Sequence, residues 1–208
     1  MKCNVVAISR TLGAGGEDLG SELAKQLGFR YVDGEIIDRA AAAAGVSTQT
    51  IARAEARKPL IARILENMAK NSAGSMMAAG IPEPPMAIDD MPTYEQLIVD
   101  VIRETAVQGN VVIVAHGASI PLAGTPGLIR VMVTASAETR TQRVAAAGTG
   151  DADRAKKAVS DSDRARADYF RRFYRVDHEL PTHYDMVLNT DVVDIDHAAK
   201  ALLALAKG

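Results

Sequence analysis

Apolar positions along this chain follow two different patterns, and the patterns alternate. Short, continuous apolar or β-branched runs predict buried strands, whereas apolar residues spaced three and four apart predict helices. The predicted strands are the run ending at Ile8 and the segments 29–32, 111–115, 129–134 and 186–189. The predicted helices are one that carries the apolar positions from Leu19 to Leu27, and the segments 35–44, 47–57, 59–70, 93–107, 137–147, 153–175 and 195–206. Five strands separated by helices favour an α/β fold, in which a parallel sheet is covered by helices on both faces.

One stretch interrupts this alternation, and we expect the chain to consist of a core and two inserts. Residues 71–92 are rich in proline and glycine, which is typical of a loop or flexible cover. We therefore expect one domain of 208 residues, with a core formed by 1–45, 94–140 and 177–208. Inserts are expected at about 46–93 and 141–176.

Composition narrows the class of protein. Apolar residues make up 48% and charged residues 24%, as in ordinary globular proteins. The net charge of -2 gives no reason to expect nucleic-acid binding. Cys3 is the only cysteine, which excludes a disulfide framework and a multi-cysteine zinc site. Without a signal peptide or an apolar run of about twenty residues, we expect no membrane contact and a cytoplasmic location.

A glycine-dense turn follows the first strand and precedes the first helix. Gly13, Gly15 and Gly16 allow consecutive backbone N–H groups to turn inward, and the positive end of the helix dipole faces the same hollow. Such a cradle suits phosphate, although the same glycines also fit a simple tight turn. The predicted phosphate-binding residues are Ser9, Gly13, Ala14, Gly15, Gly16, Glu17 and Asp18.

The turn lacks the lysine of a Walker A loop, G-x-x-x-x-G-K-[ST]. Gly16 stands at the lysine position and Glu17 at the position of the hydroxyl that holds magnesium. Arg10 is the nearest cation, and we expect it to replace the lysine unless the site has lost its chemistry. Asp18 is the candidate metal ligand, because magnesium prefers oxygen donors.

Four segments resemble the cytidylate kinase-like family of P-loop nucleoside monophosphate kinases, in the family's order and over nearly the whole chain. They are AISRTLGAGGEDLGSELAKQLGFRYVDGEIIDRA (7–40), VVIVAHGA (111–118), DRARADYFRRFY (163–174) and YDMVLNTD (184–191). The resemblance implies a P-loop NTPase-type three-layer fold with a five-stranded sheet, a helical acceptor-binding insert (46–93) and an arginine-rich lid (141–176). It also implies transfer of the ATP γ-phosphoryl group to a nucleoside monophosphate, CMP or dCMP, with Mg²⁺.

The lid region is rich in arginine, as phosphoryl transfer requires. Arg166 and Tyr169 match the family pattern D-x-x-R-x-x-Y, and the predicted catalytic residues are Arg10, Arg143 and Arg166. Helical spacing also places Arg164, Arg171 and Arg175 on one face. The alternative is a solvated helix in which Asp163 and Arg166 form a surface pair. The arginines of this region are Arg140, Arg143, Arg154, Arg164, Arg166, Arg171, Arg172 and Arg175.

The resemblance also implies the acceptor site. Asp33 and Arg39 fit the family's spacing for acceptor binding, although Asp33 also fits a helix cap. Where the family commonly has Gly-Arg after the third strand, this chain has Ala115-His116, so His116 either contacts the acceptor or only packs. Tyr169 completes the predicted acceptor-binding set.

The last strand is followed by Asn189-Thr190-Asp191, which corresponds to the adenine-contacting loop of related kinases. Asn189 and Asp191 are therefore predicted nucleotide-binding residues, although Asn and Asp also favour plain turns.

Two functions remain open. One is an active phosphotransferase that uses ATP and Mg²⁺ on a nucleotide or other small phosphate acceptor. The other is a catalytically silent nucleotide-binding module with a degenerate P-loop, used for sensing or partner binding. The sequence leaves base preference open, as it does the choice between monomer and homodimer.

Overall fold

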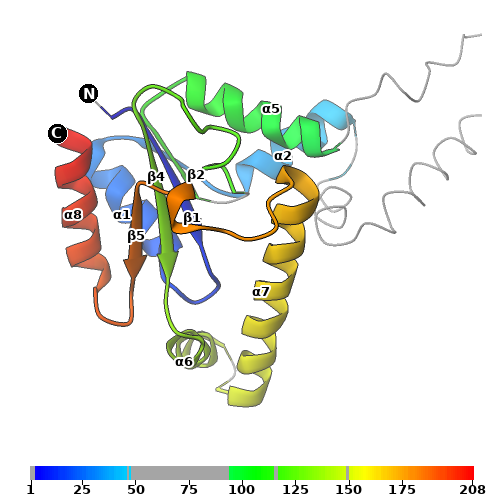
Figure 1. Ribbon diagram of the computed structural model, residues 1–208, viewed down its shortest axis with the longest axis vertical. Coiled ribbons are helices and arrows are strands. Elements are labelled where there is room, and N and C mark those ends of the chain that lie inside the picture. Colours follow the sequence, from blue (N-terminus) through cyan, green and yellow to red (C-terminus); the bar gives the residue numbers. More distant parts are fainter. Residues whose placement is uncertain (1–2, 46, 48–93, 115–116, 149) are drawn as a thin grey trace, which may run out of the picture. The chain divides into compact units, whose positions relative to one another are not determined.

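The computed structural model describes residues 3–45, 47, 94–114, 117–148 and 150–208. The chain divides into two compact units, residues 1–36 with 99–208, and residues 37–98. All five strands belong to the first unit (Figure 1). The predicted helices 47–57 and 59–70 and the predicted loop 71–92 lie outside the described residues.

The first unit is built on a parallel sheet with the strand order β2-β3-β1-β4-β5. The strands are β1 (Val5–Arg10), β2 (Arg30–Val32), β3 (Val111–Val114), β4 (Leu128–Thr134) and β5 (Met186–Asn189). The prediction of an α/β fold with a five-stranded parallel sheet is confirmed. Ligands of such sheets bind beyond the carboxyl ends of the strands, where the order reverses, which here is the end of β1.

The central strand is longer than its apolar run predicts. The prediction that it ends at Ile8 is wrong, because Ser9 and Arg10 continue the ladder opposite Met132 and Val133 of β4. Backbone pairing with a longer neighbour keeps polar residues in strand conformation after the apolar pattern has stopped. Arg10 is therefore the last residue of the central strand.

The helices of the described chain follow the predicted periodicities, with ends that differ by one residue or so. They are α1 (Gly16–Leu27), α2 (Glu35–Ala44), α5 (Tyr94–Val107), α6 (Ala137–Ala147), α7 (Ala152–Tyr174) and α8 (Ile195–Lys207), with a short 3₁₀ turn at Pro181–His183. None of these helices is long and apolar enough to cross a membrane.

Arg175 corrects the predicted arginine face of α7. It lies just beyond the helix, in the left-handed conformation with φ 58°, and the next residue closes the helix, because the Val176 N–H donates to the Phe170 carbonyl at 3.2 Å. Arg175 therefore does not share a helical face with Arg164 and Arg171.

One face of the sheet carries α1 and α8, which pack side by side (Figure 1). Their buried residues include Leu19 and Leu23 of α1 and Leu202 of α8, which contact the apolar side chains of the sheet. A Cβ atom on Gly20 would overlap the Val114 side chain, so glycine lets α1 approach the sheet closely. This close packing fixes the amino-terminal end of α1 beside the end of β1.

Candidate active site

The loop between β1 and α1 has a conformation that depends on glycine. Gly13 and Gly15 have φ values of 80° and 82°, in the left-handed region that other residues rarely adopt. A Cβ atom on Gly13 would also lie 2.8 Å from the Arg140 carbonyl oxygen. The Ala14 amide donates to the Thr11 carbonyl at 3.1 Å, which closes the loop on itself. The loop is thus a tight turn whose backbone leads directly into α1.

The start of α1 offers unused backbone donors. Within the described chain, the amides of Gly15, Gly16, Glu17 and Asp18 donate to no protein acceptor. Four free amides at the positive end of a helix dipole fit an anion such as a phosphate group. The backbone at this point therefore fits the predicted phosphate cradle.

The missing lysine has a steric explanation. A Cβ atom at Gly16 would lie 2.5 Å from Cβ and 2.7 Å from Cγ of Arg10, so any side chain at position 16 would collide with the arginine stem. Arg10 thus fills the space that a Walker A lysine would enter. Its Nε lies 2.5 Å from Glu17 Oε1, so the guanidinium reaches over the first turn of α1.

Arg166 extends from the middle of α7 to the end of the central strand. Its Nη1 donates to the Arg10 carbonyl at 3.0 Å and its Nη2 donates to Ser9 Oγ at 2.7 Å. Glu179 accepts from Nε at 2.6 Å and from Nη2 at 2.7 Å. The structure therefore brings together three of the predicted site residues, Ser9, Arg10 and Arg166, at the carboxyl end of the central strand.

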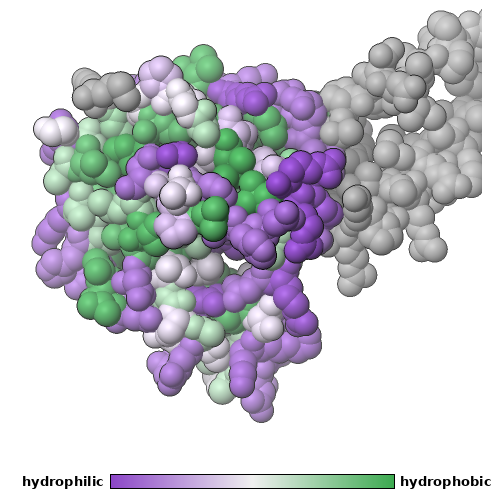
Figure 2. Space-filling view, in the orientation of Figure 1, coloured by the Kyte–Doolittle hydropathy of each residue, from purple (hydrophilic) through white to green (hydrophobic). Residues whose placement is uncertain are grey.

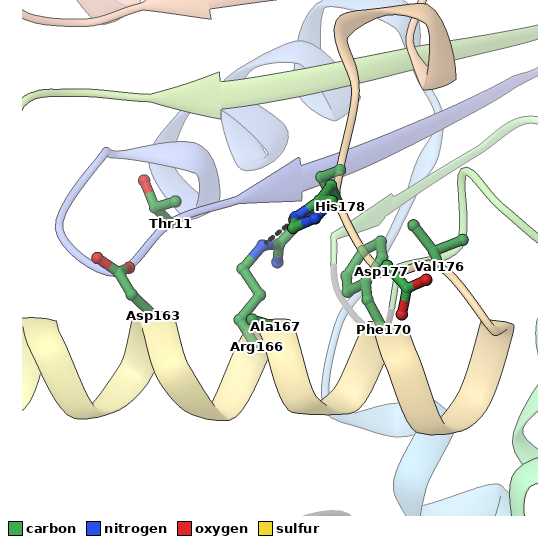
Figure 3. A pocket seen from close by; sticks show the side chains of 9 residues that line it. Thr11, Asp163, Arg166, Ala167, Phe170, Val176, Asp177 and His178 are labelled. Carbon is green, nitrogen blue, oxygen red and sulfur yellow. Dashed lines mark hydrogen bonds and ion pairs between the residues drawn. The ribbon is translucent and has the colours of Figure 1, made fainter.

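A cavity of about 280 Å³ lies beside Arg166 (Figure 3). Thr11 of the loop and the Arg166 side chain line it from different elements, and Glu179 lies on its wall. The other lining residues are Asp163, Ala167, Phe170, Val176, Asp177 and His178. The cavity therefore lies next to the glycine loop, from which Thr11 lines it.

The alternative interpretation, a surface pair of Asp163 with Arg166, is wrong. Asp163 instead accepts from Nη1 and Nη2 of Arg140, both at 2.8 Å, and the Arg140 side chain is buried. This bidentate pair ties α6 to α7, whereas Arg166 turns to Glu179. By contrast, Arg164 and Arg171 are largely exposed, in keeping with the hydrophilic surface along α7 (Figure 2).

Arg143 braces the loop from α6. It donates to Thr190 Oγ1 at 2.9 Å and to the Thr190 carbonyl at 2.7 Å, and Thr190 Oγ1 in turn donates to the Ala14 carbonyl at 2.9 Å. Arg143 also lies 3.4 Å from the Gly13 carbonyl. Its guanidinium is thus engaged in fixing the shape of the cradle, next to the predicted site.

The adenine-loop residues also have structural partners. Asp191 accepts hydrogen bonds from the amide and hydroxyl of Ser136 at the start of α6, and its own amide donates to Asn189 Oδ1. Hydrogen bonds from Thr139 and Ser136 lower the pKa of the Asp191 carboxyl. The nucleotide-binding role of Asn189 and Asp191 stays a prediction.

The acceptor-binding role of Asp33, Arg39, His116 and Tyr169 stays a prediction, and these residues belong to different parts of the chain. Asp33 follows β2 in the first unit, whereas Arg39 lies on α2 in the second. His116 lies outside the described residues. Tyr169 of α7 stacks on Phe173 with ring centroids 4.1 Å apart.

The predicted metal ligand, Asp18, is exposed in the first turn of α1. Nowhere in the described chain do three or more His, Cys, Asp or Glu side chains gather as a ready-made metal site. The carboxylates of Glu17 and Asp18 are nevertheless the kind of donor that magnesium accepts, beside the amides that fit phosphate.

Three residues at the site were missed by the sequence reasoning: Glu179, Tyr184 and Thr190. Thr190 lies inside a loop that was singled out, but only its neighbours were assigned. Glu179 lies in the connection after α7, between the resembling segments 163–174 and 184–191, and belongs to neither. The Tyr184 hydroxyl donates to Glu179 Oε1, and burial, followed by the Glu179 charge, raises the pKa of Tyr184 to about 12. Tyr184 opens the resembling segment 184–191, but nothing in the sequence indicates that Tyr184 or Glu179 is a partner of the Arg166 site.

Comparison with known proteins agrees with this architecture. The sequence matches the model of the cytidylate kinase-like family over residues 5–192. No curated protein matches the chain in sequence. An uncharacterized protein from Eubacterium ventriosum is similar in structure, with a TM-score of 0.65, 17% identity and 98% of each chain covered. Shikimate kinase from Bacteroides thetaiotaomicron has a TM-score of 0.52, 14% identity and 97% of each chain covered. TT1252 from Thermus thermophilus has a TM-score of 0.50, 15% identity and full coverage of both chains. At these identities the structural likenesses show the fold, which is that of the P-loop kinases.

Proposed function

We propose that this chain, which belongs to the cytidylate kinase-like family, is an ATP-dependent phosphotransferase acting on a small phosphate acceptor. CMP and dCMP are the first acceptors to test. The observation that carries the proposal is the contact of Arg166 with Ser9 and the Arg10 carbonyl. It holds two arginines beside four free amides at the carboxyl end of the central strand.

These groups suit the charge that phosphoryl transfer develops. An acceptor oxygen forms a bond to the γ-phosphorus while the bond to the β,γ-bridging oxygen breaks, and ADP leaves with that oxygen. The amides of 15–18 would hold the phosphate chain, and Arg10 would supply the charge of the missing lysine. Arg166 would stabilise the transferring group, whose equatorial oxygens carry the developing charge. Arg143 would act through the loop backbone that it braces.

Magnesium would neutralise phosphate charge and orient the donor, with Asp18 as its protein ligand, directly or through water. Glu17 is the second carboxylate within reach of the loop, and it is paired with Arg10. Phosphate binding that drew Arg10 away would release Glu17.

Acceptor recognition would fall to residues that the family resemblance assigns, Asp33, Arg39, His116 and Tyr169. Arg39 suits the acceptor's phosphate, because a planar guanidinium can grip two oxygens at once. Asn189 and Asp191 would contact the adenine of the donor.

The test is ADP release from MgATP with each nucleoside monophosphate, compared with the rate without acceptor. Arg10→Ala should reduce kcat/KM for ATP by about 100-fold or more, as expected when a charge-stabilising donor is lost. Arg103→Ala is the matched control, because Arg103 is an exposed arginine 3.9 Å from Asp100. Equal kinetics for Arg10→Ala and the wild type would refute the role of Arg10.

The Arg10–Glu17 pair is the observation that favours the second candidate, a silent nucleotide-binding module. If Glu17 kept Arg10 in this ion pair, Arg10 would not neutralise the transferring phosphoryl group. The amides of the cradle would then bind phosphate without catalysing its transfer. That module predicts no turnover with any acceptor but a rise of the melting temperature with ATP. If ATP gave neither turnover nor stabilisation, both candidates would be wrong.

A further inference from the structure

We propose that Glu179, supported by Tyr184, is the positioning residue that aims the Arg166 guanidinium at the phosphoryl-transfer site. The inference rests on the proposed function and adds to it two residues to which the sequence assigned no role. It starts from the way in which the donors of Arg166 are used.

A guanidinium has five N–H donors, and four of those on Arg166 have oxygen acceptors among the described residues. Nε and one N–H of Nη2 bind Glu179, the second N–H of Nη2 binds Ser9 Oγ, and one N–H of Nη1 binds the Arg10 carbonyl. One N–H of Nη1 is left for a ligand. A bidentate carboxylate on one edge of the guanidinium therefore decides where the remaining donor lies.

The pair is shielded enough to hold its geometry. The side chains of Arg166 and Glu179 are 18% and 19% exposed, and the Phe170 ring lies 4.7 Å from the guanidinium carbon. Shielding from water strengthens the interaction, in contrast to the exposed pairs elsewhere on α7. Arg166 is thus fixed in place against the end of β1.

Glu179 is itself held in place by a buried tyrosine. The Tyr184 hydroxyl donates to Glu179 Oε1, the oxygen that also receives Arg166 Nη2, and Ser9 contacts the same hydroxyl. Burial raises the pKa of Tyr184 to about 12, so its hydroxyl stays protonated and remains a donor at neutral pH. Ser9, Arg166, Glu179 and Tyr184 are thereby joined by a chain of hydrogen bonds at the end of the central strand.

The arrangement explains why a segment outside the lid helix reaches the site. Glu179 and Tyr184 lie on the connection between α7 and β5, where the 3₁₀ turn of Pro181–His183 separates them. This connection carries both Glu179 and Tyr184, so the position of Arg166 depends on a segment outside α7. Arg166 is the residue that would touch the phosphoryl group, and Glu179 acts through it.

The experiment compares Glu179→Gln, Glu179→Asp and Tyr184→Phe in the full chain, with Glu22→Gln as the control. Glu22 of α1 accepts an exposed hydrogen bond from Gln26, so its replacement also removes a carboxylate acceptor. Glu179→Gln should lower kcat about 10- to 100-fold with little change of KM for ATP, since a misplacement of about 1 Å can cost 100-fold. Tyr184→Phe should lower kcat less, and Glu179→Asp should recover part of the loss of Glu179→Gln.

A crystal structure of Glu179→Gln should show the guanidinium moved from Ser9 Oγ and the Arg10 carbonyl. If Glu179→Gln and Tyr184→Phe only lowered the melting temperature and left kcat and the position of Arg166 unchanged, the role of Glu179 and Tyr184 would be structural and the inference would be wrong. Failure of the proposed function has a different signature, which is a wild-type protein without turnover on any acceptor. In that case the position of Arg166 in the Glu179→Gln crystal still decides whether Glu179 holds it.

Discussion

The contact between Gly16 and Arg10 gives the sharpest prediction about the cradle, because one methyl group is enough to test it. Gly16→Ala adds a Cβ atom 2.5 Å from Cβ and 2.7 Å from Cγ of Arg10. Carbon atoms are most stable at about 3.5 to 4.0 Å, so the two residues must separate by roughly 1 Å. Arg10 cannot retreat easily, because its backbone pairs with β4.

The size of the effect follows from two opposing terms. Overpacking of this kind costs about 1 to 3 kcal/mol. Alanine is the better helix former by about 1 kcal/mol at most, and Gly16 has no left-handed φ that alanine would have to adopt. We therefore expect Gly16→Ala to lower the free energy of unfolding by about 1 to 2 kcal/mol in urea titrations. ATP affinity should fall about tenfold or more in calorimetric titration, because the displaced arginine no longer reaches the cradle.

Gly34→Ala is the control, since among the described residues nothing lies within 4 Å of the added Cβ and its φ is not left-handed. Arg10→Ala would be a poor partner for a double-mutant cycle, because it keeps the Cβ atom at 2.5 Å. Arg10→Gly removes both colliding atoms, and Gly16→Ala should cost less stability in that background. If Gly16→Ala were as stable as the wild type and bound ATP equally well, the steric argument would be refuted.

Two further predictions concern charged pairs. Asp163→Asn should lower the free energy of unfolding by about 2 kcal/mol, because it leaves the buried Arg140 without its carboxylate. In Asp161→Asn, where the arginine and lysine partners are exposed, the loss measured in urea should be much smaller, and equal losses would contradict the argument. Hydrogen bonds from Arg130 lower the pKa of Asp185, so this carboxylate stabilises the fold above its unfolded pKa of about 3.9 and loses that contribution as pH falls through the lower folded value. The stability difference between wild type and Asp185→Asn should therefore shrink in urea titrations from pH 5 down to pH 3, and a difference independent of pH would rule this out.

The extent of the parallel sheet shows where local pattern stops being informative. Apolar runs predicted all five strands, because burial on both faces requires them to be continuously hydrophobic. They did not predict that Ser9 and Arg10 extend β1, since this extension depends on the partner strand β4 and not on their own side chains. This extension places Arg10 in the last position of β1 and not in the loop, and its side-chain stem lies against Gly16.

The charged residues of α7 show the same limit for side-chain pairing. Helical spacing put Asp163 next to Arg166, and the two are neighbours on the helix surface. Each nevertheless has a better partner elsewhere, Arg140 for Asp163 and Glu179 for Arg166. Those partners lie on other elements and gain strength from burial, which spacing along one helix does not reveal.

Hydrophobic periodicity was enough to predict the α/β class and the succession of elements, and the glycine turn was enough to predict where an anion would bind, because each of these depends on interactions between residues close along the chain. Packing in three dimensions alone determined that the Arg10 stem lies against Gly16, that Thr190 and Arg143 brace the loop, and that Glu179 with Tyr184 contacts Arg166. Several of these contacts join residues far apart along the chain, 13 positions for Arg166 with Glu179 and 176 for Thr190 with Ala14, and they gain strength because folding excludes water from them.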